Sequence, residues 1–366
     1  MTGWKECKLG EFVESISETY TFKPNEEVVF LNTSDIYLGQ VINRELQNCT
    51  GLPGQAKKRI KRGDFLFSEI RPANGRYAMI DFDAENYVVS TKLMVLRCND
   101  KIDGGFFKIF LTAKEQLEYL QMIAEDRSGT FPQITFHHIS SLEILLPPLP
   151  EQRAIAAVLS SLDDKIDLLH RQNKTLEGIA SALWRKMFIE DADPKWKRGK
   201  LGDLFVLHRG YDLPVQNRTE GKYAILSASG ISGFHHEYKA KGPGVVTGRS
   251  GLLGKVFFIT KDFWPLNTAL YVSEFRIGTP LFSYFLLKST DLEGLNGGSA
   301  VPTLNRNDVH SIETSLPNKE EIYFFESQCS SFYEKIDRNT IHIHSLGKVR
   351  DTLLPKLMSG EVRVRL

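Results

Sequence analysis

Two segments of the chain carry apolar side chains at alternating intervals of four and three residues, which is the spacing of a coiled-coil seam. The pattern predicts one long helix within residues 148–190 and a second within residues 318–366. The first seam consists of Ile155, Leu159, Leu162, Ile166, Leu169, Asn173, Leu176, Ala180, Leu183 and Met187. The second seam consists of Phe325, Cys329, Phe332, Ile336, Asn339, Ile343, Leu346, Arg350, Leu353 and Leu357.

The two predicted helices are natural partners, and their side chains favour an antiparallel arrangement. When Ile155 lies opposite Leu357, the residue numbers in every layer sum to 512 and Asn173 faces Asn339. A buried asparagine pair specifies the register of a coiled coil at some cost in stability. A parallel arrangement would place Asn173 beside Ile343 and leave its amide without a polar partner. We therefore expect Asn173 and Asn339 to contact each other.

The same plan occurs twice along the chain, which indicates an internal duplication. The pattern WK followed by KLGE at Trp4 recurs as WK followed by KLGD at Trp196, and Lys165-Ile166-Asp167 recurs as Lys335-Ile336-Asp337. Each copy has short β-type runs separated by Gly and Pro, and then one of the helical segments. The predicted blocks are globular at 1–147, helical at 148–190, globular at 191–317 and helical at 318–366. The predicted fold class is α+β: two mixed α/β domains joined by two long helices in an antiparallel coiled coil, with a pseudo-twofold internal repeat.

Composition places the chain among ordinary globular proteins. Hydrophobic residues make up 42% and charged residues 25%, which excludes disordered and low-complexity classes. The sequence has neither a run long enough to span a bilayer nor a signal peptide, so we expect a cytoplasmic protein that contacts no membrane. Its four cysteines are far apart and are expected to be reduced thiols. Because the formal net charge is +1, any nucleic-acid site must be a local patch.

Several strings of the sequence resemble the DNA-specificity (S) subunit of type I restriction-modification systems, and the resemblance covers essentially the whole chain. Two strings resemble the conserved regions of that family, and four resemble parts of its target-recognition domains. The first two are LPPLPEQRAIAAVLSSLDDKID at 146–167 and LLPKLMSGEVRV at 353–364. The others are GDFLFSEIRP at 63–72, SGTFPQIT at 128–135, VVTGRSGLLGKV at 245–256 and GGSAVPTLN at 297–305.

The resemblance implies that blocks 1–147 and 191–317 are target-recognition domains, each reading one half of a split double-stranded DNA sequence. The helical blocks would set the gap between the halves. It also implies two modification (methyltransferase) subunits that bind S-adenosylmethionine and transfer methyl groups, and restriction/translocase subunits that cleave. The chain itself would need no cofactor. Because the two copies share few recognition-domain residues, we expect them to read different half-sites of an asymmetric target.

Candidate DNA-binding residues lie in basic runs and Gly-rich turns. The densest basic run, just before a strand-like segment, suits phosphate binding, with a solvated surface turn as the alternative. In the Gly-rich turns the backbone can approach phosphates, and arginine can fork onto guanine. The run consists of Lys57, Lys58, Arg59, Lys61 and Arg62, with Lys239 and Lys241 in the comparable place of the second copy. The turns contribute Arg71, Asn74 and Arg76 in the first copy, and Arg249, Ser250 and Lys255 in the second.

The end of each globular block adds donors for base edges or phosphates. These are Thr130, Gln133, Thr135, His137 and His138 in the first copy, and Ser299, Thr303, Asn305 and Arg306 in the second. Thr135 and Asn305 could equally cap the short helices that follow them.

We predict neither a metal site nor catalysis by this chain. Adjacent histidines such as His137-His138 and His235-His236 should point to opposite faces, and no HExxH frame exists. The sequence also lacks a phosphate-binding loop, a GxGxxG after a strand and a nucleophile elbow. The predicted function is therefore a non-catalytic DNA-recognition subunit. The alternatives are a non-DNA scaffold with two protein-binding heads on a coiled-coil stalk, and an enzyme whose site shows no known motif.

Overall fold

The computed structural model describes residues 3–127, 132–296 and 302–365 of the chain. The chain forms two compact units, and each unit combines one globular block with parts of both long helices. Unit 1 contains residues 1–165 and 346–366, and unit 2 contains residues 166–345. Within the described part of the chain, no helix is both long and apolar enough to cross a bilayer.

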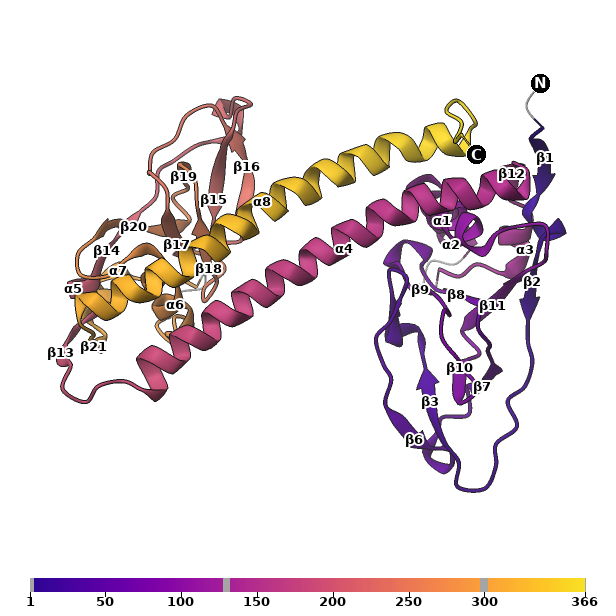
Figure 1. The fold of residues 1–366 in the computed structure, drawn as a ribbon, viewed down its shortest axis with the longest axis horizontal. Helices are drawn as coiled ribbons and strands as arrows, with labels where there is room; N and C mark the ends of the chain where they lie inside the picture. Colours follow the sequence, from indigo (N-terminus) through magenta and orange to yellow (C-terminus); the bar gives the residue numbers. More distant parts are fainter. Residues whose placement is uncertain (1–2, 128–131, 297–301, 366) are drawn as a thin grey trace. The chain divides into compact units, whose positions relative to one another are not determined.

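The globular part of unit 1 contains two four-stranded sheets and two two-stranded sheets (Figure 1). The central sheet has the order β2-β11-β8-β9, and the second sheet has the order β6-β3-β10-β7. The strands are β1 (Lys5–Lys8), β2 (Val13–Ile16), β3 (Glu27–Leu31), β4 (Ile36–Tyr37), β5 (Gln40–Val41), β6 (Leu46–Asn48), β7 (Ala56–Arg59), β8 (Phe65–Ser68), β9 (Tyr77–Met79), β10 (Tyr87–Ser90), β11 (Leu93–Cys98) and β12 (Glu143–Leu146). The helices are α1 (Gly104–Thr112), α2 (Lys114–Arg127) and α3 (Phe136–Ser140), with 3-10 turns η1 (Leu9–Glu11), η2 (Thr33–Asp35), η3 (Cys49–Gly51) and η4 (Pro72–Asn74).

Unit 2 repeats the topology of the central sheet, as the duplication predicts, but its second sheet has three strands where that of unit 1 has four. Its central sheet has the order β14-β20-β17-β18, strand for strand the order of unit 1, and its second sheet has the order β16-β15-β19. The strands are β13 (Lys197–Lys200), β14 (Phe205–Arg209), β15 (Tyr223–Ser227), β16 (Gly230–His235), β17 (Gly244–Gly248), β18 (Val256–Ile259), β19 (Phe263–Pro265), β20 (Ala269–Phe275) and β21 (Glu313–Leu316). The helices are α5 (Leu201–Leu204), α6 (Pro280–Ser289) and α7 (Arg306–Ser311), with a 3-10 turn η6 (Val215–Asn217).

The two long helices are α4 (Leu149–Arg185), which ends in a π-helical turn over Lys186–Glu190, and α8 (Lys319–Met358). Within unit 2 they run antiparallel, because the Phe188 and Phe325 rings lie 5.6 Å apart while Asn173 meets Asn339 further along. Asn339 Nδ2 donates to Asn173 Oδ1 at 2.8 Å, so the predicted contact is present. Asn339 is 2% exposed, and this bond satisfies part of its buried amide.

α8 ends at Met358, one residue after the last seam position Leu357. Ser359 N–H donates to the carbonyl of Pro355 at 3.0 Å. The following segment returns to the start of the chain, where Arg363 bonds Glu151 and stacks over the Trp4 ring at 5.4 Å. Trp4 Nε1 also donates to Glu151 Oε2 at 2.9 Å. A buried carboxylate therefore ties both ends of the chain to the first turn of α4.

Candidate nucleic-acid interface

The basic run that overlaps β7 has some side chains that point into the protein and others on the surface. Lys57 and Arg59 are exposed and available to a phosphate, whereas Lys58 points inward, as alternation along a strand requires. Its ammonium donates to the carbonyls of Thr91 at 3.3 Å and Leu93 at 2.8 Å, and burial lowers the pKa of Lys58. Two of the three N–H groups of Lys58 therefore bind the protein itself, and its phosphate contact stays a prediction.

The second half of the run is exposed but lies close to acids. Lys61 and Arg62 are on the surface, and Arg62 Nε donates to the carbonyl of Asp81 at 2.7 Å. Hydrogen bonding by Arg97 lowers the pKa of Glu18, and the charges of Lys61 and Arg59 act in the same direction. The sequence has no acid within this run, but folding brings Glu18 beside it.

The Gly-rich turn after β8 presents two of its three candidate side chains. Arg71 precedes η4 and Asn74 is its last residue; both are exposed, and the backbone of Arg71 is left-handed with φ 46°. Arg76 is half-buried: its Nη1 donates to the carbonyls of Ser34 and Ile36 at 3.2 Å, and its guanidinium lies 5.3 Å from the Tyr37 ring centroid. Arg76 therefore holds the β4 segment through one nitrogen of its guanidinium, and its contact with DNA stays a prediction.

The end of the first globular block lies against this turn. Ile70 forms an antiparallel bridge with Gln133, and Arg71 N–H donates to the carbonyl of Pro132 at 3.1 Å. The fold thus brings together two candidate groups that are about sixty residues apart in the sequence. Thr135 begins α3 as its N-cap residue, and its N–H donates to His138 Nδ1 at 3.0 Å.

His137 is exposed on α3. The candidate residue Thr130 lies outside the described residues, as does Ser299 in the second copy.

The second copy has the same junction, by which we mean the contact between the turn after the central strand and the end of the globular block, but with different side chains. Ser250 bridges Thr303, and Gly251 N–H donates to the carbonyl of Pro302 at 3.0 Å, as Arg71 does to Pro132. Asn305 caps α7 by accepting from Asn307 N–H at 3.0 Å, so the capping interpretation holds there. Lys255 and Arg306 are exposed, as are Lys239 and Lys241.

Charge is reversed between the copies at one position of this junction. Glu69 N–H donates to Lys92 O at 3.1 Å, and Arg249 N–H makes the corresponding bond to Thr268 O at 2.9 Å. Glu69 therefore occupies the place that Arg249 occupies in the second copy. A carboxylate accepts from cytosine and a guanidinium donates to guanine, so the two junctions differ in the bases that they suit.

Several polar side chains near Arg249 are absent from the candidates that the sequence predicts. The exposed His208 lies in β14, the exposed Tyr211 and Asp212 follow it, and the half-buried Asn267 lies in the turn before β20. The hydroxyls of Tyr211 and Tyr271 lie 3.0 Å apart, and Asn267 Nδ2 donates to Asp212 Oδ1. No motif joins segments that are more than fifty residues apart, so the sequence alone gives no signal for this cluster.

One trio of possible metal ligands occurs among the described residues, at His235, His236 and Glu237. Their ligand atoms lie within 4.8 Å of one another. His235 and His236 do not point apart as strand alternation predicts, because β16 ends at His235 and the two ring centroids are 4.4 Å apart. Thr219 N–H already donates to His235 Nδ1 at 3.1 Å, which leaves one nitrogen of that ring for a metal.

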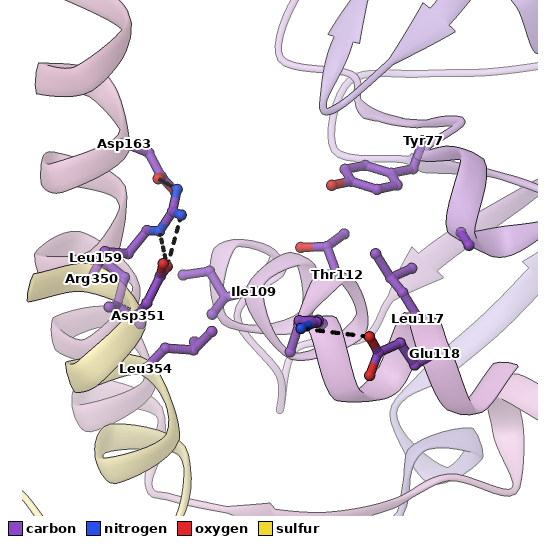
Figure 2. Close-up of a pocket in the computed structure, with 13 residues that line it drawn as sticks. Tyr77, Ile109, Thr112, Leu117, Glu118, Leu159, Asp163, Arg350, Asp351 and Leu354 are labelled. Atoms are coloured by element: carbon purple, nitrogen blue, oxygen red, sulfur yellow. Dashed lines mark hydrogen bonds and ion pairs between the residues drawn. The ribbon is translucent and has the colours of Figure 1, made fainter. Parts of the chain in front are cut away.

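A cavity of about 460 Å³ separates the globular part of unit 1 from its helices (Figure 2). Figure 2 shows Arg350 between Asp163 and Asp351 on the helix side, facing Tyr77 and Thr112 across the cavity. Arg350 Nη1 lies 2.8 Å from Asp163 Oδ1. The cavity contains none of the candidate DNA-binding residues.

Aromatic rings take the corresponding positions in unit 2. Tyr333, which the repeat aligns with Asp163, packs against Phe258 at 4.9 Å and Tyr284 at 5.9 Å between centroids. Tyr284 and Lys288 also bond Glu177 of α4 at 3.0 Å and 2.6 Å. The two globular parts therefore contact their helices through different chemistry, despite their common topology.

Comparison with known proteins gives the family. A family model described as "Type I restriction modification DNA specificity domain" matches residues 1–178 and 194–349, one match for each copy. The duplicated recognition fold on a helical pair thus defines a DNA-specificity protein. The chain belongs to the type I restriction-modification DNA specificity family.

Individual relatives agree with this assignment. The chain is 31% identical to the type I restriction enzyme HindI specificity subunit of Haemophilus influenzae, over 99% of this chain and 100% of the relative. It is 27% identical to the MjaIX specificity subunit of Methanocaldococcus jannaschii, over 72% and 70% of the two chains. The crystal structure of the S subunit from M. genitalium has the same fold, with a TM-score of 0.69 at 18% identity, and covers 98% of this chain and 96% of that one.

Proposed function

We propose that this chain is the DNA-recognition subunit of a type I restriction-modification complex, in which each globular block reads one half of a bipartite target. The observation that carries the proposal is the repeated junction between the turn after the central strand and the end of the block. Ile70 bridges Gln133 in the first copy, and Ser250 bridges Thr303 in the second. The first junction presents the exposed cation Arg71. The second presents Gly251, where the space that a Cβ atom would take is open, and the exposed Lys255 follows in the same turn.

The target proposed for this chain is asymmetric. Glu69 and Arg249 occupy equivalent positions with opposite charge, and the neighbouring cations differ between the copies. A palindromic target would require two readers of the same chemistry. Different side chains at one position therefore favour different half-sites.

The long helices are proposed to set the gap between the half-sites and to dock two modification subunits. Helices of 37 and 40 residues are about 55 and 60 Å long, which exceeds a DNA turn of about 34 Å. The pair of half-buried Asn173 and buried Asn339 would fix their register, because any shift leaves two amides without partners.

Chemistry is assigned to the partners in this proposal. The modification subunits would bind S-adenosylmethionine and transfer the methyl group, and restriction/translocase subunits would cleave. This chain would contribute recognition alone, since its sequence contains no Asp-Pro-Pro-Tyr or Asn-Pro-Pro-Tyr stretch of the kind found in amino-methyltransferases.

Footprinting of the chain assembled with its modification subunits tests the proposal. We expect two protected patches on target DNA, separated by roughly one helical turn. A complex that protects no DNA would contradict it. The chain incubated alone with labelled S-adenosylmethionine and DNA should transfer no label, and methylation by the chain alone would refute the non-catalytic assignment.

A further inference from the structure

Arg249 is held in place more firmly than a surface arginine usually is. Its N–H donates to Thr268 O at 2.9 Å and its carbonyl accepts from Leu304 N–H at 2.8 Å, so the backbone is fixed on both sides. The side chain is half-buried, and Nη1 donates to the carbonyl of Asn267 at 3.0 Å. A guanidinium has five N–H groups in a planar fork, so this bond orients the fork and leaves donors for a ligand.

The carbonyl that orients Arg249 belongs to a residue that is itself fixed. Asn267 N–H donates to Tyr211 O at 3.0 Å, and its side-chain Nδ2 donates to Oδ1 of Asp212. The Tyr211 N–H in turn donates to Pro265 O at 2.8 Å. Asp212 is exposed and lies 3.4 Å from Arg209 Nη2.

Glycine at position 210 permits this close approach. A Cβ atom there would lie 2.2 Å from the carbonyl oxygen of Leu266, so any other residue would push the 210–212 loop away from the turn that contains Asn267. The loop and the turn thus form one rigid support for the Arg249 side chain.

The first copy uses the equivalent carbonyl differently. The backbone bonds of Glu69 and Arg249 align Thr91 with Asn267, and the Thr91 carbonyl accepts from Lys58 Nζ at 3.3 Å. Lys58 also donates to Leu93 O at 2.8 Å, so two of the three N–H groups of its ammonium are used internally. A cation reaches the same backbone position in both copies, but the guanidinium of the second copy keeps a fork that can bind two acceptors at once.

We propose that Asp212 is a positioning residue that, through Asn267, aims the Arg249 guanidinium at a guanine in the second half-site. Guanine presents O6 and N7 in the major groove as the paired acceptors that fit an arginine fork. The inference rests on the proposed function. It adds the base that is recognised, a guanine, and the residue that positions Arg249 toward it, Asp212.

The test uses the chain assembled with its modification subunits, and reads out methylation of DNA libraries in which each base pair of both half-sites is varied. Arg249→Ala should lower discrimination about ten- to a hundredfold at one G·C pair of the second half-site. Asp212→Ala should lower discrimination several-fold at that same pair and at no other. Asp212→Asn should retain it, because the amide oxygen still accepts from Asn267.

Glu274→Ala is the matched control, because it removes an exposed carboxylate from β20 of the same unit, where Glu274 pairs with Arg276 at 3.6 Å. It should leave every base preference unchanged. A wild-type complex that methylates without sequence preference would defeat the proposed function itself. If Arg249→Ala relaxes one pair while Asp212→Ala relaxes none, or a different one, the proposed function stands and the positioning role is refuted.

Discussion

Replacement of Asp64 with alanine should lower the melting temperature of unit 1 by roughly 6–12 °C, which corresponds to about 3 kcal/mol. The Asp64 side chain is fully buried and accepts from Arg97 Nε at 2.7 Å, Arg97 Nη2 at 3.0 Å and Lys61 N–H at 2.9 Å. Alanine would leave the guanidinium of Arg97, which is 21% exposed, without its main counter-charge at the central sheet. Differential scanning calorimetry measures the shift.

Glu18→Ala provides the matched control for this prediction. Glu18 pairs with the same arginine at 2.8 Å, but its carboxylate is 52% exposed. Water replaces an exposed partner at little cost, so this variant should melt close to the wild type. Equal shifts for the two variants would mean that burial does not decide the contribution of the Arg97 pairs.

Replacement of Arg363 with methionine should lower the melting temperature by about 5 °C at neutral pH, and the difference should shrink in acid. Burial opposes ionisation of Glu151, but the hydrogen bonds from Arg363 and Trp4 outweigh it and lower the pKa of the carboxyl. This stabilisation is present above the ordinary glutamate pKa of about 4.3 and is lost as pH falls through the lowered value.

In the Arg363 variant, burial would act without the arginine and raise the pKa of Glu151. The variant would then lose stability as pH rises above about 4.3, where the wild type keeps it. Melting curves between pH 3 and pH 7 compare the two proteins, with Arg365→Met as the control for loss of an exposed cation nearby. A difference that is constant with pH would show that Glu151 is not the group involved.

The helices and the duplication are predictable from the sequence because both depend on local periodicity. The 4-3 spacing locates α4 and α8, and pairing like with like across the seam predicts the Asn173–Asn339 contact. The path of residues 359–365 after α8 is not predictable in this way, because Arg363 binds Glu151 and lies over Trp4, which are far away in the sequence.

The sequence predicts which kinds of residue form the candidate interface. It does not predict which of them point outward, or which positions of the two copies are equivalent. The sequence alone predicts one basic run that includes Lys58, although alternation along β7 directs this side chain inward. The equivalence of Glu69 with Arg249 emerges from backbone hydrogen bonds that short, dissimilar loops do not reveal. Asn267 and Asp212 lie 55 residues apart and meet only because the 210–212 loop packs on the turn before β20.

We propose that the helical pair keeps the two different target-recognition domains at a set separation. Duplicating residues 160–166 in α4 and residues 346–352 in α8 adds one heptad to each helix and preserves the layer pairing on both sides. Each helix becomes about 10 Å longer, which corresponds to about three base pairs. Mapping of the methylated sites on genomic DNA from cells that carry the complex should show both half-sequences unchanged and a gap about two to three base pairs wider. An unchanged gap with intact methylation would contradict the claim.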